Sequence, residues 1–216
     1  MSAFFPFELE PPPWIYRLLS RMGLMQRLYR RVAVDLVEAM PTGGLLVDVG
    51  AGPGHLLQRV AAARPDIRLA VLDWSFAMLR PSHQSPGDIP ISGPVLRLVG
   101  DAAAIPLQTA CCDLAVATFS LHTWNHPVRG VQEMRRLVKP GGRVWIYEMN
   151  REATWPQFRA LARQEALPLP LVAAGFKLVS WNHALRAGDF AATMARAGIS
   201  RWKLTEVHNL FWRAVF

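Results

Sequence analysis

A glycine-rich turn between an apolar run and a helical segment is the feature that most constrains how this chain folds. Leu45–Val49 is typical of a buried strand, and the turn Gly50–Gly54 follows it directly. Glycine lets a backbone turn sharply and approach a ligand closely, because no Cβ stands in the way. The amides at the start of the next helix, predicted over 55–63, favour polar or anionic groups such as a carboxylate. The turn therefore predicts a ligand site at the end of a strand.

The spacing of the glycines separates two kinds of nucleotide-binding fold. A dinucleotide fingerprint, G-x-G-x-x-G, that starts at Gly50 requires its third glycine at position 55. That position is His55, and the glycine is Gly54 instead. Asp73, at the end of the next predicted strand, suits ribose hydroxyls in either fold and does not discriminate. The spacing thus argues against a dinucleotide site.

Short β-rich runs alternate with helical segments between residues 45 and 148. Further strands are predicted at 69–72, 95–99, 114–118 and 143–148, further helices at 75–79 and 128–138, and a loop rich in proline, serine and glycine at 81–94. This alternation predicts a parallel sheet with ligands at the carboxyl ends of its strands.

The two ends of the chain depart from this alternation. Helical spacing runs from Trp14 to about Met40, with a break expected at Gly23. The segments expected after residue 150 are a helix at 154–165, an irregular stretch at 166–186, a helix at 189–197, and an antiparallel pair formed by 201–207 and 211–216. A long irregular stretch is more often a functional lid than an ordinary connection.

The predicted fold is a single α/β domain of 216 residues. We expect a Rossmann-like, doubly wound, mostly parallel seven-stranded sheet with a C-terminal antiparallel hairpin. Within it we expect an N-terminal helical cap (1–42), a cofactor-binding core (43–150), a substrate lid (151–200) and a closing β-hairpin (201–216).

The net charge of +8 lies mainly in the last third, where residues 151–216 carry nine cations and four acids, a net +5. Such a balance permits attraction to nucleic acid or to an anionic membrane. No run of five or more basic residues occurs, so nucleic-acid binding is not favoured. The basic, aromatic first helix also fits a membrane surface, an alternative that is not favoured either.

Cys111 and Cys112 are sequence neighbours, which disfavours a disulfide and leaves no CxxC metal pair. No metal site is predicted. Residues 1–13 have no basic residue before their apolar stretch, unlike a signal peptide. The longest uncharged apolar run, about 166–176, falls well short of the roughly 20 residues of a membrane span. We therefore expect a cytoplasmic protein.

Five motifs, in order over residues 45–149, resemble those of class I S-adenosylmethionine-dependent methyltransferases, in particular the branch that modifies quinones and natural products. They are Asp48–Gly54, Asp73–Leu79, Gly100–Ala102 with Ile105 and Pro106, Asp113–Trp124, and Leu137–Gly142. The resemblance implies S-adenosylmethionine as the cofactor.

The resemblance also implies roles for individual residues. The methionine part of the cofactor would lie against the turn, the ribose on an acid, the adenine against an aromatic ring and a second acid, and the methyl group near a phenylalanine. In that order the residues are Gly50 and Gly52; Asp73; Trp74, Asp101 and Ala102; and Phe119. Asp48 and Ala51 of the same turn are also expected to bind the cofactor. Trp74 and Phe119 also fit ordinary core aromatics, and Asp101 fits a turn cap.

Methyl transfer from a sulfonium is an in-line displacement, so a base is needed only where the attacking atom must lose a proton. His122, after the fourth strand, is the candidate base, with a structural histidine as the alternative. Acceptor contacts are expected from aromatic and arginine residues in the less regular parts of the chain. These residues are Trp14, Arg17, Trp124 and Arg151. They favour a small apolar or aromatic acceptor.

Two other functions fit the sequence. The basic last third is compatible with a methyltransferase acting on RNA or protein, and the motifs would also serve a non-catalytic S-adenosylmethionine-binding protein. The acceptor, the attacking atom and the formation of homo-oligomers are left open.

Overall fold

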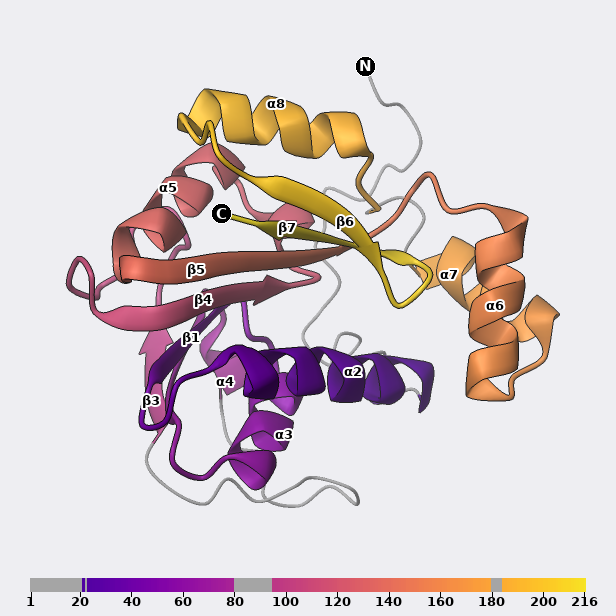
Figure 1. Ribbon diagram of the computed structural model, residues 1–216, viewed down its shortest axis with the longest axis horizontal. Helices are drawn as coiled ribbons and strands as arrows, with labels where there is room; N and C mark the ends of the chain where they lie inside the picture. The colour runs from indigo at the N-terminus through magenta and orange to yellow at the C-terminus, as the bar shows by residue number, and fades with distance from the viewer. Residues whose placement is uncertain (1–20, 22, 80–94, 180–183) are drawn as a thin grey trace.

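The computed structural model describes residues 21, 23–79, 95–179 and 184–216, which form one sheet flanked by helices (Figure 1). The sheet has seven strands in the order β3-β2-β1-β4-β5-β7-β6. The strands are β1 (Leu45–Val49), β2 (Arg68–Asp73), β3 (Val95–Val99), β4 (Cys112–Thr118), β5 (Val138–Met149), β6 (Lys203–Val207) and β7 (Phe211–Val215). The first five are parallel to one another, whereas β7 runs antiparallel to both β5 and β6.

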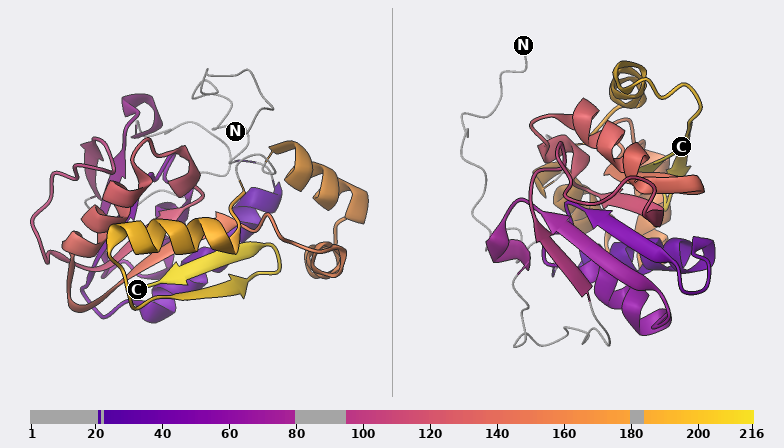
Figure 2. Two further views of the ribbon diagram at one scale, coloured as in Figure 1. Left: turned by 90° about the horizontal axis from the view of Figure 1, so that it is seen from above. Right: turned by 90° about the vertical axis from the view of Figure 1, so that its left-hand side faces the viewer.

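Helices cover both faces of this sheet (Figures 1 and 2). They are α2 (Gly23–Ala39), α3 (His55–Ala63), α4 (Phe76–Leu79), the short 3-10 helix η1 (Leu121–Thr123), α5 (Pro127–Leu137), α6 (Trp155–Glu165), α7 (Leu169–Val179) and α8 (Ala187–Ala197). Helices α2 and α3 lie on one face, and α5 and α8 on the other. Across the described ranges, no helix is both long enough and apolar enough to span a bilayer.

Alternating side chains of the central strands feed two separate cores. In β4, Leu114 and Val116 pack with α2 and α3, whereas Ala115 and Ala117 pack with α5 and α8. Both sets are buried because helices cover both faces, which is typical of a parallel sheet. The predicted fold class, including the seven strands and the C-terminal antiparallel hairpin, is confirmed.

The stretch 166–186, expected to be irregular, contains helix α7, so this expectation was wrong. Pro168 and Pro170 suggested a broken segment, but both lie where the helix begins. The Pro168 carbonyl accepts from the amides of Leu171 and Val172. Proline is tolerated in a first helical turn because its missing N–H would have no intrahelical partner there.

Helix α8 belongs to the core, although the predicted lid range 151–200 includes it. Phe190 and Met194 are fully buried and share a cluster with Val131 and Met134 of α5. A helix whose apolar side chains fill the core cannot open without exposing them to water. Within that range, only α6 and α7 remain candidates for a lid.

A third apolar cluster joins α6 and α7 to α2 and to the end of the sheet. Phe158, Leu161 and Phe176 pack there with Leu28 of α2 and Phe211 of β7. The pair α6–α7 therefore sits beside α2 rather than on either main core, as Figure 1 shows.

A buried acid reinforces this junction. Glu165, the last residue of α6, is 5% exposed. Its carboxylate pairs with Arg27 at 3.3 Å, and Arg31 Nε donates to its Oε1 at 3.0 Å. The two arginines lie one turn apart on α2, so one carboxylate connects α6 to one face of that helix.

We expect Glu165→Gln to lower the free energy of unfolding by about 1–2 kcal/mol, since hydrogen bonds to charged groups contribute more than neutral ones. The loss of stability should not exceed this range, because both arginine side chains are partly exposed and water screens their charges. Denaturant unfolding measures it, with Glu38→Gln, an exposed acid on α2, as the matched control. Equal stability of the two variants would contradict a role for the ion pair.

Candidate functional site

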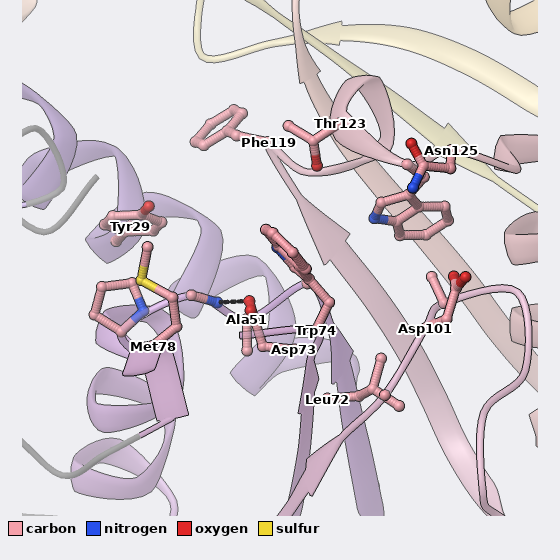
Figure 3. A pocket seen from close by; sticks show the side chains of 16 residues that line it. Tyr29, Ala51, Leu72, Asp73, Trp74, Met78, Asp101, Phe119, Thr123 and Asn125 are labelled. Atoms are coloured by element: carbon pink, nitrogen blue, oxygen red, sulfur yellow. Dashed lines mark hydrogen bonds between the residues drawn. The ribbon is translucent and has the colours of Figure 1, made fainter. Parts of the chain in front are cut away.

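The glycine turn opens onto a pocket of about 330 Å³ at the carboxyl ends of β1, β2 and β4. Elements far apart in sequence line it, from α2 to the turn after β4 (Figure 3). The lining residues are Tyr29, Gly50, Ala51, Gly52, Pro53, Leu72, Asp73, Trp74, Met78, Gly100, Asp101, Ala102, Phe119, Thr123, Trp124 and Asn125. Eight of the nine residues predicted to contact a cofactor are among them, the exception being Asp48.

Glycine is required at Gly50 for two independent reasons. Its φ is +76°, a conformation that residues with a Cβ rarely adopt. A Cβ there would also lie 2.6 Å from the Ser120 side chain, whose hydroxyl donates to the Val49 carbonyl at 3.0 Å. By contrast, a Cβ at Gly52 would meet nothing within 4 Å, although Gly52 lines the pocket. The turn thus packs tightly on its protein side and leaves open space on its pocket side.

Asp73 ties the turn to the end of β2. Its Oδ2 accepts from the Gly52 amide at 2.8 Å, and its Oδ1 accepts from the Ser75 amide at 2.9 Å. Burial raises the pKa of this carboxyl, and these two hydrogen bonds offset only part of the rise. Asp73 lies between Tyr29 and Asp101, which mark opposite ends of the pocket in Figure 3. A carboxylate there can accept from ligand hydroxyls in the middle of the pocket.

The residues predicted for adenine all line the pocket. Trp74 is 68% exposed while lining the pocket, so it is not the core aromatic of the alternative interpretation. Asp101 does cap its turn, since its Oδ1 accepts from the Ala103 amide at 2.8 Å, and it also lines the pocket. Ala102 is buried beside it. One aromatic face and one exposed acid can therefore meet a flat base.

Phe119 lines the pocket and packs into the protein at the same time. Its ring centroid lies 5.1 Å from that of Phe211 and 6.2 Å from that of Tyr29. Its φ of +55° is uncommon for a large side chain. Such strain persists only where the surroundings enforce it, and here the Phe119 amide donates to the Tyr147 carbonyl at 2.9 Å. The ring is consequently held between the pocket and the α6–α7 cluster.

Asp48 lies beneath the turn and not on the pocket wall. It is 2% exposed, and its Oδ1 has no hydrogen-bond partner among the described residues. Burial, followed by the nearby charge of Asp73, raises its pKa from 3.8 to about 7. An orphaned buried carboxylate is costly unless a ligand supplies a donor or a positive charge.

His122 is also absent from the pocket wall. Its Nδ1 lies 2.9 Å from Oε2 of the fully buried Glu148 on β5, and its backbone amide donates to the other carboxylate oxygen at 3.3 Å. Burial lowers the pKa of His122, but the charge and hydrogen bond of Glu148 outweigh it and leave the pKa above its usual value. The sequence had no local signal for this partner, which lies 26 residues away.

The four predicted acceptor contacts have different locations. Trp124 lines the pocket, and its ring lies so close to Gly130 of α5 that a Cβ there would come within 2.4 Å of it. Arg151 follows β5 away from the pocket wall, where its amide donates to the Leu185 carbonyl. Trp14 and Arg17 lie outside the described residues.

Tyr29 of α2 is the lining residue that sequence reasoning missed most clearly. It sits in the apolar pattern of the helix, so nothing local distinguished it from core residues. Burial and the charge of Asp48 raise the pKa of its phenol, although Arg59 acts in the opposite direction. Only the packing of α2 against α3 brings it to the glycine turn.

Comparison with known proteins shows that this chain is similar to methyltransferases. Residues 47–146 match the methyltransferase domain family. Over 153 residues the chain is 33% identical to a demethylmenaquinone methyltransferase of Renibacterium salmoninarum, covering 70% of this chain and 60% of the relative. Over 188 residues it is 30% identical to a demethylmenaquinone methyltransferase of Thermobifida fusca, covering 86% of this chain and 78% of the relative.

Among solved structures, a SAM-dependent methyltransferase from Aquifex aeolicus superposes with a TM-score of 0.70 at 15% identity. The match covers 95% of this chain and 98% of the other. At that identity the likeness shows a shared fold.

Proposed function

Because the chain belongs to the class I S-adenosylmethionine-dependent methyltransferase family, we propose that it transfers a methyl group from S-adenosylmethionine to a small aromatic or apolar acceptor. The observation that carries this proposal is the convergence of the glycine turn, Asp73 and Asp101 on one pocket. When bound, the cofactor supplies an electrophilic methyl group on a sulfonium. The protein's contribution is to bind the cofactor and the acceptor, to orient them towards each other, and to exclude water.

The described residues fit the cofactor from end to end. Asp73 would accept from the ribose hydroxyls, and Trp74 and Asp101 would meet the adenine at one end of the pocket. At the other end, the open side of Gly52 would receive the methionine part. The orphaned carboxylate of Asp48 would face its ammonium.

We further propose a quinol as the acceptor, by analogy with the relatives named as demethylmenaquinone methyltransferases. Phe119 and Trp124, which line the pocket, supply flat apolar surfaces suited to an aromatic ring. The helices α6 and α7 are the proposed cover over this acceptor, and residues 43–150 the proposed cofactor-binding core. Both cysteines are free thiols, which supports the cytoplasm as the proposed location.

The test uses S-adenosylmethionine labelled in its methyl group and chemically reduced demethylmenaquinone with a short side chain. Labelled methylated quinol is the expected product, absent with Asp73→Ala. Parallel reactions contain bulk RNA or a protein extract, and a binding experiment contains NADH. Label transferred only to a macromolecule would refute the proposal that the acceptor is a quinol. Binding of S-adenosylmethionine without transfer to any acceptor would favour a non-catalytic binding protein. Tight NADH binding would refute S-adenosylmethionine as the cofactor.

We propose that His122 is the general base and that Glu148 orients it. The supporting observations are the 2.9 Å contact between them and the sequence position of His122 directly before Thr123 and Trp124, two residues of the pocket wall. We expect His122→Gln to lower kcat by about 100-fold. Binding of S-adenosylhomocysteine should change less than twofold. His126→Gln, an exposed histidine beyond the same turn, is the control. A similar kcat for both variants would assign His122 a structural role.

A further inference from the structure

An arginine of α3 packs against α2, the helix that supplies Tyr29 to the pocket wall. Arg59 faces α2, where its Nη2 donates to Gln26 Oε1 at 2.6 Å. Its Nε is buried and has no hydrogen-bond partner in the part of the chain that the structure describes. A buried N–H donor left without an acceptor is costly, so this guanidinium is incompletely satisfied by the protein itself.

Among the residues that the structure describes, Arg59 lacks a compensating acid. None of the ion pairs among the described residues includes it. Burial lowers the pKa of this guanidinium, and a second cation, Arg30, lowers it further. A partly buried cation beside another cation is unfavourable unless an anion joins them.

Arg59 and a charge of the opposite sign act on the same residue of the pocket wall. The buried Asp48 carboxylate and the Arg59 guanidinium both act on the Tyr29 phenol, with opposite effects on its pKa. Tyr29 lines the pocket at the end opposite Asp101. Each of the two groups also has one buried polar atom, Asp48 Oδ1 or Arg59 Nε, with no hydrogen-bond partner within the described ranges. A carboxylate and a guanidinium that both act on one lining residue are complementary to the ammonium and carboxylate of an α-amino acid.

We infer that Arg59, held in place by Gln26, is the counter-charge for the carboxylate at the amino-acid end of S-adenosylmethionine. This inference rests on the proposed function. Arg59 thereby makes the pocket selective for adenosyl ligands that keep the amino-acid chain over ligands that have lost it. No motif marked this residue, because it lies in the second turn of α3, beyond the glycine turn.

Two ligands that share the adenosine and differ in the amino-acid end test the inference by calorimetry. S-adenosylhomocysteine carries the carboxylate, and 5′-methylthioadenosine lacks it. We expect Arg59→Ala to weaken binding of S-adenosylhomocysteine by about 10- to 100-fold, the value of a charge-assisted hydrogen bond. Binding of 5′-methylthioadenosine should change less than threefold. Arg59→Lys, which keeps the charge, should recover part of the loss.

Arg30→Ala is the matched control, since it removes a neighbouring exposed cation and should change either affinity less than threefold. Thermal unfolding verifies that each variant is folded, and Arg59→Gln replaces the alanine variant if that one is unstable. The inference would be overturned if Arg59→Ala weakened the affinity for both ligands equally or for neither. It would also be overturned if Arg30→Ala weakened S-adenosylhomocysteine binding as much as Arg59→Ala does. If the wild-type protein bound neither ligand, that result would instead refute the proposed function.

Discussion

Replacing Asp73 with alanine is expected to weaken S-adenosylhomocysteine binding by about 100- to 1000-fold. A ribose donates two hydroxyls, and each hydrogen bond to a charged acceptor is worth about 1.5–3 kcal/mol. The same substitution removes the acceptor for the Gly52 and Ser75 amides, so the turn loses its connection to β2. Both effects act in the same direction. Calorimetry with the purified variant measures the loss.

Two further variants separate these effects. Asp73→Asn keeps an oxygen for the Gly52 amide but removes the charge, so it should retain the fold and still lose at least about tenfold in affinity. Asp101→Ala removes a single exposed contact at the adenine end and should cost about tenfold or less. If Asp73→Ala bound the ligand within threefold of the wild type, the pocket would not hold a ribose at Asp73.

At pH 8, Asp48→Asn is expected to be more stable than the wild type by up to about 4 kcal/mol. The folded protein holds the pKa of Asp48 at about 7, against 3.8 for the ordinary carboxyl, a gap of about three units at about 1.4 kcal/mol each. Between these values the folded state binds more protons than the unfolded state, so the stability of the wild type falls as pH rises from about 4 to about 7. Asparagine removes that titration.

Denaturant unfolding at several pH values measures this difference. The advantage of Asp48→Asn should shrink to about 1 kcal/mol near pH 4.5, because only about 0.7 of a pH unit then separates the solution from the ordinary carboxyl pKa of 3.8. Glu38→Gln, an exposed acid on α2, should show no such trend. A constant difference across this range would mean that Asp48 is ionised at no cost. The stabilised variant should nevertheless bind S-adenosylhomocysteine more weakly, because it lacks the charge proposed to face the ligand's ammonium.

Much of the fold was predictable because it depends on short-range patterns. Strands 45–49 and 95–99 and helix 55–63 have the bounds expected from periodicity. The pairing of Asp73 with the glycine turn was also expected, since adjacent parallel strands bring their carboxyl ends together. The error at α7 arose from treating prolines as helix breakers without regard to their position at a helix start.

The rest of the site depends on contacts between segments that no local pattern connects. Tyr29 looked like one more apolar residue of a helix until α2 packed on α3. Similarly, nothing around His122 indicated that a carboxylate 26 residues later would lie 2.9 Å from its ring. Burial is equally non-local. Burial raises the pKa of Asp48, and it removes water from Arg59 Nε, which has no acceptor in the described part of the chain.

The amino-acid sequence by itself determined the alternation of strands and helices, the turn at Gly50 and the acids that end the strands. These follow from side-chain periodicity and from the conformations that glycine alone adopts readily. Only the tertiary structure decided which buried groups meet at the pocket and which of them remain unsatisfied. Those properties depend on the exclusion of water by elements distant in sequence, and desolvation is a property of the packed chain.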